Sequence, residues 1–489
     1  MSSNPNFDNA ADILAALMRQ GIAVAGMTVD SRQVKPGMVF AAYPGEAGDG
    51  RLHVAAASKA GAVAILWEQA DFNWPEELGS VPNIPVHDLK DKVGEIAAQI
   101  YGNPSHDLWV MGVTGTNGKT SCTQWLAQGF AALCRKTAVV GTLGNGFPPK
   151  LDYTGNTTPD AAVLQASLAQ YRDAEAAGVA MEVSSHGLDQ GRVNGVQFDV
   201  AVLTNLTRDH LDYHGDMDSY AKAKARLFEW PGLGYAILNL DDAFGRELAA
   251  KHAQGPAKVI GYGFEHGNVV GKDLMLSPTG LVMTIESDWG CAEMHSPLLG
   301  RFNAQNLLAC LAVMLVSGVA LQDAVAALST VKAVDGRMQT IGGNLAPLVV
   351  IDYAHTPDAL EKVLMSLREL NSTGQIWCVF GCGGERDAGK RPIMGEIAMR
   401  LADRVMVTSD NPRGENPQEI IAAIRTGMNG LEQVEANRAL AIAKVVASAK
   451  VGDVVLVAGK GHEDYQEIAG IKYPFRDLLV ASQALEARA

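Results

Sequence analysis

The chain has 489 residues, 47% of them hydrophobic and 19% charged, and its formal net charge is −14. A single hydrophobic core does not serve a chain of this length, so about three domains are expected. This composition excludes a disordered chain, and the negative charge argues against a nucleic-acid partner, because binding to a phosphate backbone needs clustered Lys and Arg.

The N-terminal stretch MSSNPNFDNAADILAALMRQG predicts an amphipathic helix and lacks the basic-then-apolar order of a secretory signal. No apolar stretch reaches ~18 residues, so we expect no membrane insertion and predict a cytoplasmic protein, acting as a monomer. The six cysteines form no CxxC pair and are interpreted as reduced core thiols. They are Cys122, Cys134, Cys291, Cys310, Cys378 and Cys382.

Three regions differ in their pattern of apolar runs. Residues 1–89 hold short runs broken by Gly and Pro, which indicates a small mixed α/β domain, and a helix-like stretch over 86–101 leads into the next region. Residues 90–333 and 334–489 each repeat an order of apolar strand, polar turn and helix, which predicts mainly parallel sheets covered by helices. The predicted strands are 110–114, 137–141, 178–183, 198–204 and 235–239, then 348–351, 376–380, 404–408 and 454–457. The fold class is therefore α/β in three domains, the last of them Rossmann-like.

Polar clusters follow these strands. In the second region they read TGTNGKT, EVSSHGLDQGR, TNLTRDHLDYHG and NLDD; in the third they read DYAHTPD, GCGGERDAGKR, SDNPRGENP and AGKGHED. Ligands of open parallel sheets bind at the carboxyl ends of the strands. The sequence therefore predicts a binding cleft between the second and third domains.

Residues 112–120, GVTGTNGKT, resemble a phosphate-binding loop, although Val113 stands where the strict Walker pattern has its first Gly. Its glycines allow backbone N–H groups to approach phosphate oxygens, and the helix start favours anions. Lys119 can bridge phosphates and the Thr120 hydroxyl can hold Mg²⁺. We predict that the central domain is a P-loop-type ATPase domain.

Two further side chains end apolar strands of the central domain. The carboxylate of Glu182 and the imidazole of His210 are candidate magnesium ligands beside a phosphate loop, although Mg²⁺ prefers oxygen and His210 equally suits a structural role. Lys222 and Lys224 in YAKAKARLFEW are typical of a solvated basic helix face.

The third domain offers groups suited to small charged ligands. Arg337 and Asp352 suit phosphate and ribose, or are ordinary surface charges. In SDNPRGEN, Asn411 and Arg413 suit an amino-acid carboxylate, the alternative being a plain Asn-Pro turn. In AGKGHED, Glu463 suits an ammonium, the alternative being a bare glycine turn.

Taken together, these motifs resemble the Mur ligase family over essentially the whole chain, and within it the branch that adds the third amino acid to UDP-N-acetylmuramoyl-L-alanyl-D-glutamate. The family's ATP loop is the shifted form TGTNGKT, and its three domains bind the UDP substrate, ATP and the incoming amino acid. The resemblance implies an ATP- and Mg²⁺-dependent ligase of peptidoglycan synthesis that forms an amide bond through an acyl phosphate. DNPR at 410–413 is the form that accompanies meso-diaminopimelate in this family.

The resemblance also implies roles for individual residues. For ATP these are Gly115, Thr116, Asn117, Gly118, Lys119, Thr120, Ser121, Asn303, Asn306, Arg337 and Asp352. For the UDP-muramoyl dipeptide they are Val29, Ser31, Glu46, Ala47, Gly48, Asn156, Thr157, Thr158, Ser184, Gln190 and Arg192, where the Glu-Ala-Gly of 46–48 departs from the His-Gln-Ala of some relatives. For diaminopimelate they are Arg391, Asp410, Asn411, Pro412, Arg413, Gly459 and Glu463. Catalysis is assigned to Lys119, Glu182, His210 and Lys224, and the metal to Thr120, Glu182, His210 and Lys224, the last as a carbamate.

Two alternatives remain at this level. A folylpolyglutamate synthetase-like ligase shares the ligase core, although the DNPR stretch and the long first domain weigh against it. A P-loop ATPase without ligase activity explains the loop but not the amino-acid-like pocket.

Overall fold

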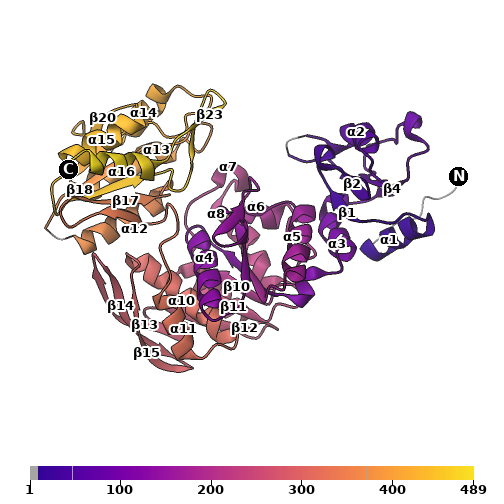
Figure 1. Ribbon diagram of the computed structural model, residues 1–489, viewed down its shortest axis with the longest axis horizontal. Helices are drawn as coiled ribbons and strands as arrows, with labels where there is room; N and C mark the ends of the chain where they lie inside the picture. Colours follow the sequence, from indigo (N-terminus) through magenta and orange to yellow (C-terminus); the bar gives the residue numbers. More distant parts are fainter. Residues whose placement is uncertain (1–8, 47, 372, 489) are drawn as a thin grey trace.

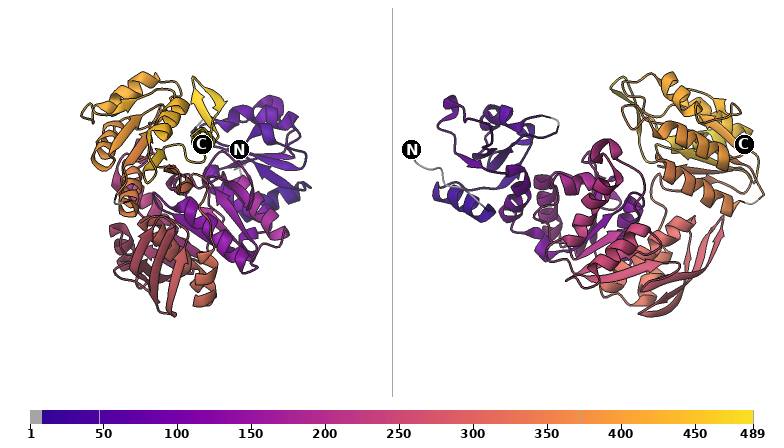
Figure 2. Two further views of the ribbon diagram at one scale, coloured as in Figure 1. Left: turned by 60° about the vertical axis from the view of Figure 1, so that its left-hand side comes forward. Right: turned by 180° about the vertical axis from the view of Figure 1, so that it is seen from behind.

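The computed structural model describes residues 9–46, 48–371 and 373–488. Three α/β domains follow one another along the chain, with the N-terminal and C-terminal domains on opposite sides of the central one (Figure 1). The view from behind shows the same separation (Figure 2). The predicted three-domain α/β fold class is therefore confirmed. No helix in the described parts of the chain is long and apolar enough to cross a membrane.

The N-terminal domain holds a parallel sheet in the order β1-β2-β3-β4. Its strands are β1 (Gly26–Thr28), β2 (Met38–Ala42), β3 (Ala64–Glu68) and β4 (Asn83–Val86). Its helices are α1 (Ala10–Arg19), α2 (Val54–Lys59) and α3 (Leu89–Ile100). Asn9 begins α1 by accepting a hydrogen bond from the Asp12 N–H, as an N-cap should. Both helices expected in this part of the chain, α1 and α3, are present.

The central domain is built on an eleven-stranded sheet in the order β15-β14-β13-β12-β11-β10-β5-β9-β6-β7-β8. The strands from β13 to β6 in this order pair in parallel, whereas β14–β15 and β7–β8 extend the two ends in antiparallel fashion. The strands are β5 (Trp109–Thr114), β6 (Thr137–Gly141), β7 (Gly144–Phe147), β8 (Lys150–Asp152), β9 (Gly178–Glu182), β10 (Val200–Leu203), β11 (Tyr235–Asn239), β12 (Lys258–Gly263), β13 (Val269–Ser277), β14 (Gly280–Ser287) and β15 (Gly290–Ser296). The helices are α4 (Lys119–Ala132), α5 (Ala161–Asp173), α6 (Ser185–Asp189), α7 (Leu211–His214), α8 (Met217–Ala225), α9 (Ala243–His252), α10 (Arg301–Val316) and α11 (Leu321–Ser329).

The C-terminal domain has a six-stranded sheet in the order β16-β17-β21-β18-β19-β20, in which only β16 is antiparallel to its neighbour among the described strands. A separate hairpin is formed by β22 and β23. The strands are β16 (Gln339–Gly342), β17 (Leu348–Asp352), β18 (Ile376–Phe380), β19 (Arg404–Val407), β20 (Gln433–Val434), β21 (Val454–Ala458), β22 (Tyr465–Ile468) and β23 (Ile471–Pro474). The helices are α12 (Pro357–Leu370), α13 (Lys390–Leu401), α14 (Pro417–Arg425), α15 (Arg438–Ser448) and α16 (Asp477–Glu486).

The linker between the central and C-terminal domains, residues 330–338, is held by helix α4. The Trp125 indole N–H donates to the Lys332 carbonyl (3.0 Å), and the Gln128 side-chain oxygen accepts from the Lys332 N–H (2.8 Å). Four residues later the linker passes the loop after β21. Gly336 has φ +65°, and a Cβ there would lie 2.1 Å from the backbone nitrogen of His462. The linker therefore contacts helix α4 of the central domain and the loop after β21 of the C-terminal domain.

Candidate active site

The predicted phosphate loop lies between β5 and α4. Gly118 caps the helix with φ +89°, and a Cβ at this position would lie 2.6 Å from Oδ1 of Asn306. The Lys119 ammonium donates to the carbonyls of Gly115 (2.8 Å) and Thr116 (2.9 Å), and burial lowers the pKa of this lysine. The loop therefore has the backbone form that a phosphate site needs, and Lys119, which is partly buried, lies beside it.

A cavity of about 240 Å³ opens beside this loop. Residues 116–121, Glu182, His210, Asn306, Arg337 and Asp352 line it. Glu182 is 1% exposed at the end of β9 and accepts from the backbone N–H (2.8 Å) and hydroxyl (3.1 Å) of Thr142. The C-terminal domain contributes Arg337, whose guanidinium lies 4.3 Å from the centre of the Tyr353 ring. Burial raises the pKa of Asp352 to about 6, against the opposing effect of Arg337.

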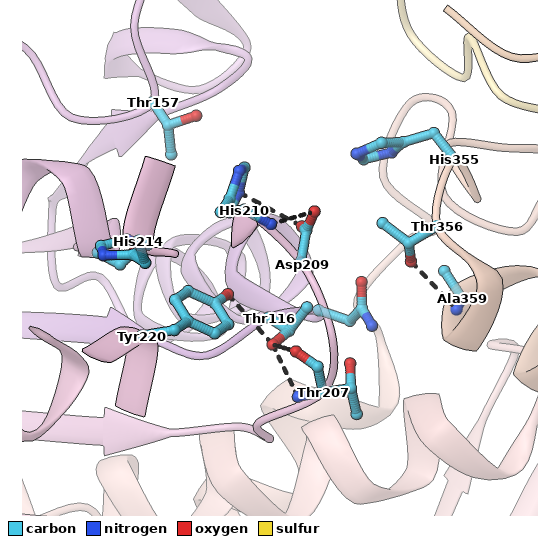
Figure 3. Close-up of polar contacts among 12 residues, drawn as sticks. Thr116, Thr157, Thr207, Asp209, His210, His214, Tyr220, His355, Thr356 and Ala359 are labelled. Atoms are coloured by element: carbon cyan, nitrogen blue, oxygen red, sulfur yellow. Dashed lines mark hydrogen bonds and ion pairs between the residues drawn. The ribbon is translucent and has the colours of Figure 1, made fainter. Parts of the chain in front are cut away.

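Residues of the two domains face each other where this cavity meets a larger one. Asp209 and His210 come from the central domain and His355 from the C-terminal domain (Figure 3). The His355 Nδ1 lies 2.7 Å from the Tyr353 carbonyl, and burial lowers the pKa of His355 to about 4, so its ring is neutral at pH 7. A carboxylate oxygen of Asp209 lies 3.3 Å from Nε2 of His210.

The polar groups around the smaller cavity suit Mg²⁺ held together with a nucleotide. Thr120 and Glu182 supply oxygen atoms, and partial burial lowers the pKa of His210, which favours the neutral imidazole that can ligate a metal. Among the residues that the structure describes, no group of three or more His, Cys, Asp and Glu could hold a metal ion. Magnesium commonly uses one or two carboxylates and completes its shell with phosphate oxygens and water, so this donor set fits it.

The larger cavity, of about 1260 Å³, lies between the central and C-terminal domains, which confirms the predicted cleft. Asp410, Asn411, Arg413, Gly459 and Glu463 line one part of it. The Arg413 guanidinium donates to the Gly384 carbonyl (2.7 Å) and lies 3.7 Å from a Glu467 oxygen. A guanidinium and the Glu463 carboxylate thus meet in one pocket, as a ligand carrying both charges would require.

Comparisons with known proteins agree along the whole chain. Three family models match in succession: "Mur ligase family, catalytic domain" over residues 23–101, "Mur ligase middle domain" over 113–314, and "Mur ligase, glutamate ligase domain" over 336–461. A curated relative from Chromobacterium violaceum, named UDP-N-acetylmuramoyl-L-alanyl-D-glutamate–2,6-diaminopimelate ligase, is 53% identical over 476 residues, which is 97% of this chain and 96% of the relative.

The chain belongs to the Mur ligase family. A relative of the same name from Neisseria meningitidis serogroup B is 50% identical over 464 residues, 94% of each chain. A solved structure of a UDP-N-acetylmuramoyl-L-alanyl-D-glutamate–2,6-diaminopimelate ligase has 39% identity, covers 95% of each chain and superposes with a TM-score of 0.69. Neither alternative function is supported by these relatives.

The positions predicted for the UDP substrate of a Mur ligase fall into two groups. Near Glu182, the Thr158 hydroxyl contacts the Glu182 carbonyl (2.9 Å) and Ser184 Oγ (3.0 Å), and Arg192 donates to the Thr158 carbonyl (2.9 Å). Asn156 and Thr157 line the cleft.

The second group lies on the N-terminal domain. Val29, Ser31, Glu46 and Gly48 lie outside both cavities, and Ala47 lies outside the described residues. Gln190 of the central domain donates to Glu46 Oε1 (2.5 Å), which brings these two predicted positions together across the domain boundary.

Two predicted diaminopimelate residues, Arg391 and Pro412, do not line the Mur ligase cleft. Arg391 follows the first residue of α13, and its guanidinium turns inward to both oxygens of Glu415, at 2.9 Å each. Arg391 also donates to the carbonyl of Gly383, which lines the cleft (3.3 Å), and its role in binding diaminopimelate stays a prediction. Arg386 and Lys390, from the same GERDAGKR stretch, line the cleft instead. Pro412 also lies off the cavity surface and shapes the turn.

Motif reasoning also missed a buried cation. Lys460 is 0% exposed and donates to Asn411 and Glu463. Its place inside AGKGHED was the available signal, but a lysine within a glycine-rich loop gives no indication of burial.

Proposed function

We propose that this protein uses ATP to join meso-2,6-diaminopimelate to the D-glutamyl side-chain carboxylate of UDP-N-acetylmuramoyl-L-alanyl-D-glutamate, in peptidoglycan synthesis. Membership of the Mur ligase family supports the ligase class, and the names of relatives 53% and 50% identical support the substrates. In this proposal residues 1–89 bind the UDP substrate, 90–333 bind ATP and 334–489 bind the amino acid.

The chemistry requires activation of a carboxylate, because oxide is too poor a leaving group for an amine to displace. Transfer of the terminal phosphoryl group of ATP gives an acyl phosphate, from which the amine displaces phosphate. Lys119 and the loop N–H groups stabilise negative charge on the transferring group, and Arg337 lies across the same cavity. The cleft joins this cavity to the amino-acid pocket, so the carboxylate can meet both reactants.

Magnesium, when bound, supplies further neutralisation of phosphate charge. Thr120, Glu182 and His210 are the residues proposed to hold it, with Lys224 contributing as a carbamate. Lys224 is 1% exposed, and burial together with the nearby Lys119 lowers its pKa well below the usual value. The neutral amine is the form that adds to CO₂, so this environment supports the modification.

The observation that carries the choice of amino acid is that Arg413 and Glu463 both line one pocket. The far end of diaminopimelate bears a carboxylate and an ammonium, whereas lysine bears only the ammonium. Lysine would bring no carboxylate to the Arg413 guanidinium, whose side chain is 19% exposed and which would keep only the more distant Glu467 oxygen, at 3.7 Å. The pocket is therefore suited to diaminopimelate.

The test measures ADP release with the UDP dipeptide saturating and either amino acid varied. Wild type should use meso-diaminopimelate at least ~100-fold better than L-lysine in kcat/KM. Arg413→Ala should remove most of this difference by weakening the use of diaminopimelate rather than by improving that of lysine. Equal values on wild type would overturn the choice of amino acid, and ADP release independent of any amino acid would overturn the ligase assignment.

A further inference from the structure

The amino-acid end of the cleft rests on two loops, residues 409–413 after β19 and 459–463 after β21. Lys460 lies behind these loops, fully buried, although its sequence neighbours Gly459 and Glu463 line the cleft. Its ammonium donates to Oδ1 of Asn411 (2.9 Å) and to Oε2 of Glu463 (2.8 Å). One buried cation therefore bridges the two loops that form the pocket.

These contacts close a ring of three side chains. Nδ2 of Asn411 donates to the same Glu463 oxygen (2.8 Å), and Oδ1 of Asn411 also accepts from the Glu467 backbone N–H (2.9 Å). The Asn411 amide has one orientation in this ring, with its oxygen toward Lys460 and its nitrogen toward Glu463. Oε2 of Glu463 receives two donors, whereas no hydrogen bond from the described residues reaches Oε1.

The ring determines how Glu463 meets a ligand. Its side chain is 17% exposed at the cleft, so the second carboxylate oxygen can accept from an ammonium in the pocket. A lysine is suited to the position behind it, because an ammonium offers three donors from a single atom. Without this cation, the Glu463 carboxylate would be largely buried with one amide donor, and solvent would compete to turn it out of the pocket.

We propose that Lys460 is a positioning residue that, together with Asn411, orients Glu463 toward the distal ammonium of the incoming diamino acid. Lys460 thereby sets the preference of this enzyme for a diamino over a monoamino dicarboxylic acid. The inference rests on the proposed function for the class of amino acid, but it assigns a separate role to a residue that does not itself touch the ligand.

A merely structural lysine and a positioning lysine predict different results with two substrates. The first substrate is meso-diaminopimelate. The second is 2-aminopimelate, which keeps the attacking amine and both carboxylates but lacks the distal ammonium. A loosened domain weakens the use of both equally, whereas a misplaced Glu463 weakens only the use of the diamino acid.

The experiment compares wild type, Lys460→Met and Lys444→Met. The control residue Lys444 lies in the same domain on α15, with its side chain 57% exposed beside Glu435. In Lys460→Met, the ratio of kcat/KM for diaminopimelate over that for 2-aminopimelate should fall ~10-fold or more, through KM for diaminopimelate. KM for ATP and the use of 2-aminopimelate should stay near wild type, as should every constant of Lys444→Met.

An unchanged ratio, an equal loss with both substrates, or a lower KM for diaminopimelate in Lys460→Met would overturn the inference. If the Met variant does not fold, the same ratio is measured on Lys460→Gln, which keeps hydrogen-bond donors and loses the charge. Its ratio should lie between that of wild type and the value expected for Lys460→Met. Failure of the proposed function has a different signature, because wild type itself would then not use diaminopimelate.

Discussion

Lys222 and Lys224 lie two residues apart on helix α8 and have opposite surroundings. Lys222 is exposed, whereas Lys224 is buried, with its ammonium 2.9 Å from the Gly115 carbonyl and 4.5 Å from the centre of the Tyr220 ring. The pair therefore provides a matched test of the proposed carbamate, in which one lysine serves as the control for the other.

Lys224→Ala should be inactive in ADP release, and short added carboxylates should restore part of the activity by replacing the carbamate. Lys222→Ala should keep wild-type activity, because a solvated lysine contributes neither packing nor a ligand. Near-normal turnover by Lys224→Ala would show that this lysine has no role in metal binding, and inactivity without rescue would argue against the carbamate.

The local sequence pattern could not have shown that Lys224 is buried and Lys222 is exposed. Both occur in the polar stretch YAKAKA, which from its residues alone indicates a solvated face, and that interpretation is right for Lys222 and wrong for Lys224. Burial of Lys224 depends on the phosphate loop, more than 100 residues earlier in the chain, packing against α8. Only the resemblance to a family pointed to Lys224.

At the scale of elements, one buried ion pair joins the starts of helices α15 and α16. The Arg438 guanidinium donates to both oxygens of Asp477 at 2.7 Å, and neither side chain is exposed. It also donates to the Ala458 carbonyl (2.9 Å), at the end of β21. The pair therefore fixes two helices against the strand that leads into the amino-acid pocket.

Arg438→Met should destabilise the C-terminal domain by about 3 kcal/mol or more, because it leaves the Asp477 carboxylate buried and unpaired. Replacing both partners, as Arg438→Met with Asp477→Leu, should recover most of this loss. The exposed pair Arg400–Glu361 supplies the control, and Arg400→Met should cost less than about 1 kcal/mol. Urea unfolding curves give the free energy of unfolding of all three variants. If Arg438→Met loses no more stability than Arg400→Met, the buried pair does not have the proposed role.

All nine predicted strands are present, and most of their residues are buried. The parallel strands β5, β6, β9, β10, β11, β17, β18, β19 and β21 begin and end within two residues of their predicted bounds. Such strands read as uninterrupted apolar runs. The strands β13, β14 and β15, which form one edge of the sheet through two antiparallel pairings, were not predicted, because residues that are not buried, such as Lys272 and Glu293, interrupt any apolar run.

At the scale of the whole molecule, the six cysteines differ in their exposure to solvent. Four cysteines are buried and free, which confirms their interpretation as core thiols: Cys122, Cys310, Cys378 and Cys382. That interpretation is wrong for Cys134 and Cys291, which are free but exposed. Burial raises the pKa of Cys378 and of Cys382 to about 12. A thiol reacts as its thiolate, so burial and a raised pKa both slow reaction.

Titration of the native protein with a thiol reagent at pH 8 should therefore modify two thiols rapidly, and all six only after unfolding in urea. Cys134→Ser with Cys291→Ser should abolish the rapid phase. Rapid reaction of more than two thiols would mean that one of the cores opens readily in the native state.

The linker at 330–338 gives the three-domain arrangement a thermodynamic consequence. It is bound to the helix of the phosphate loop at Lys332 and lies against the loop that carries Lys460 and Glu463 at Gly336. If nucleotide binding shifts this short segment, the shape of the amino-acid pocket on its other side changes as well. Coupling of this kind is symmetrical, so any factor by which nucleotide alters the affinity for the amino acid must equal the factor by which the amino acid alters the affinity for nucleotide.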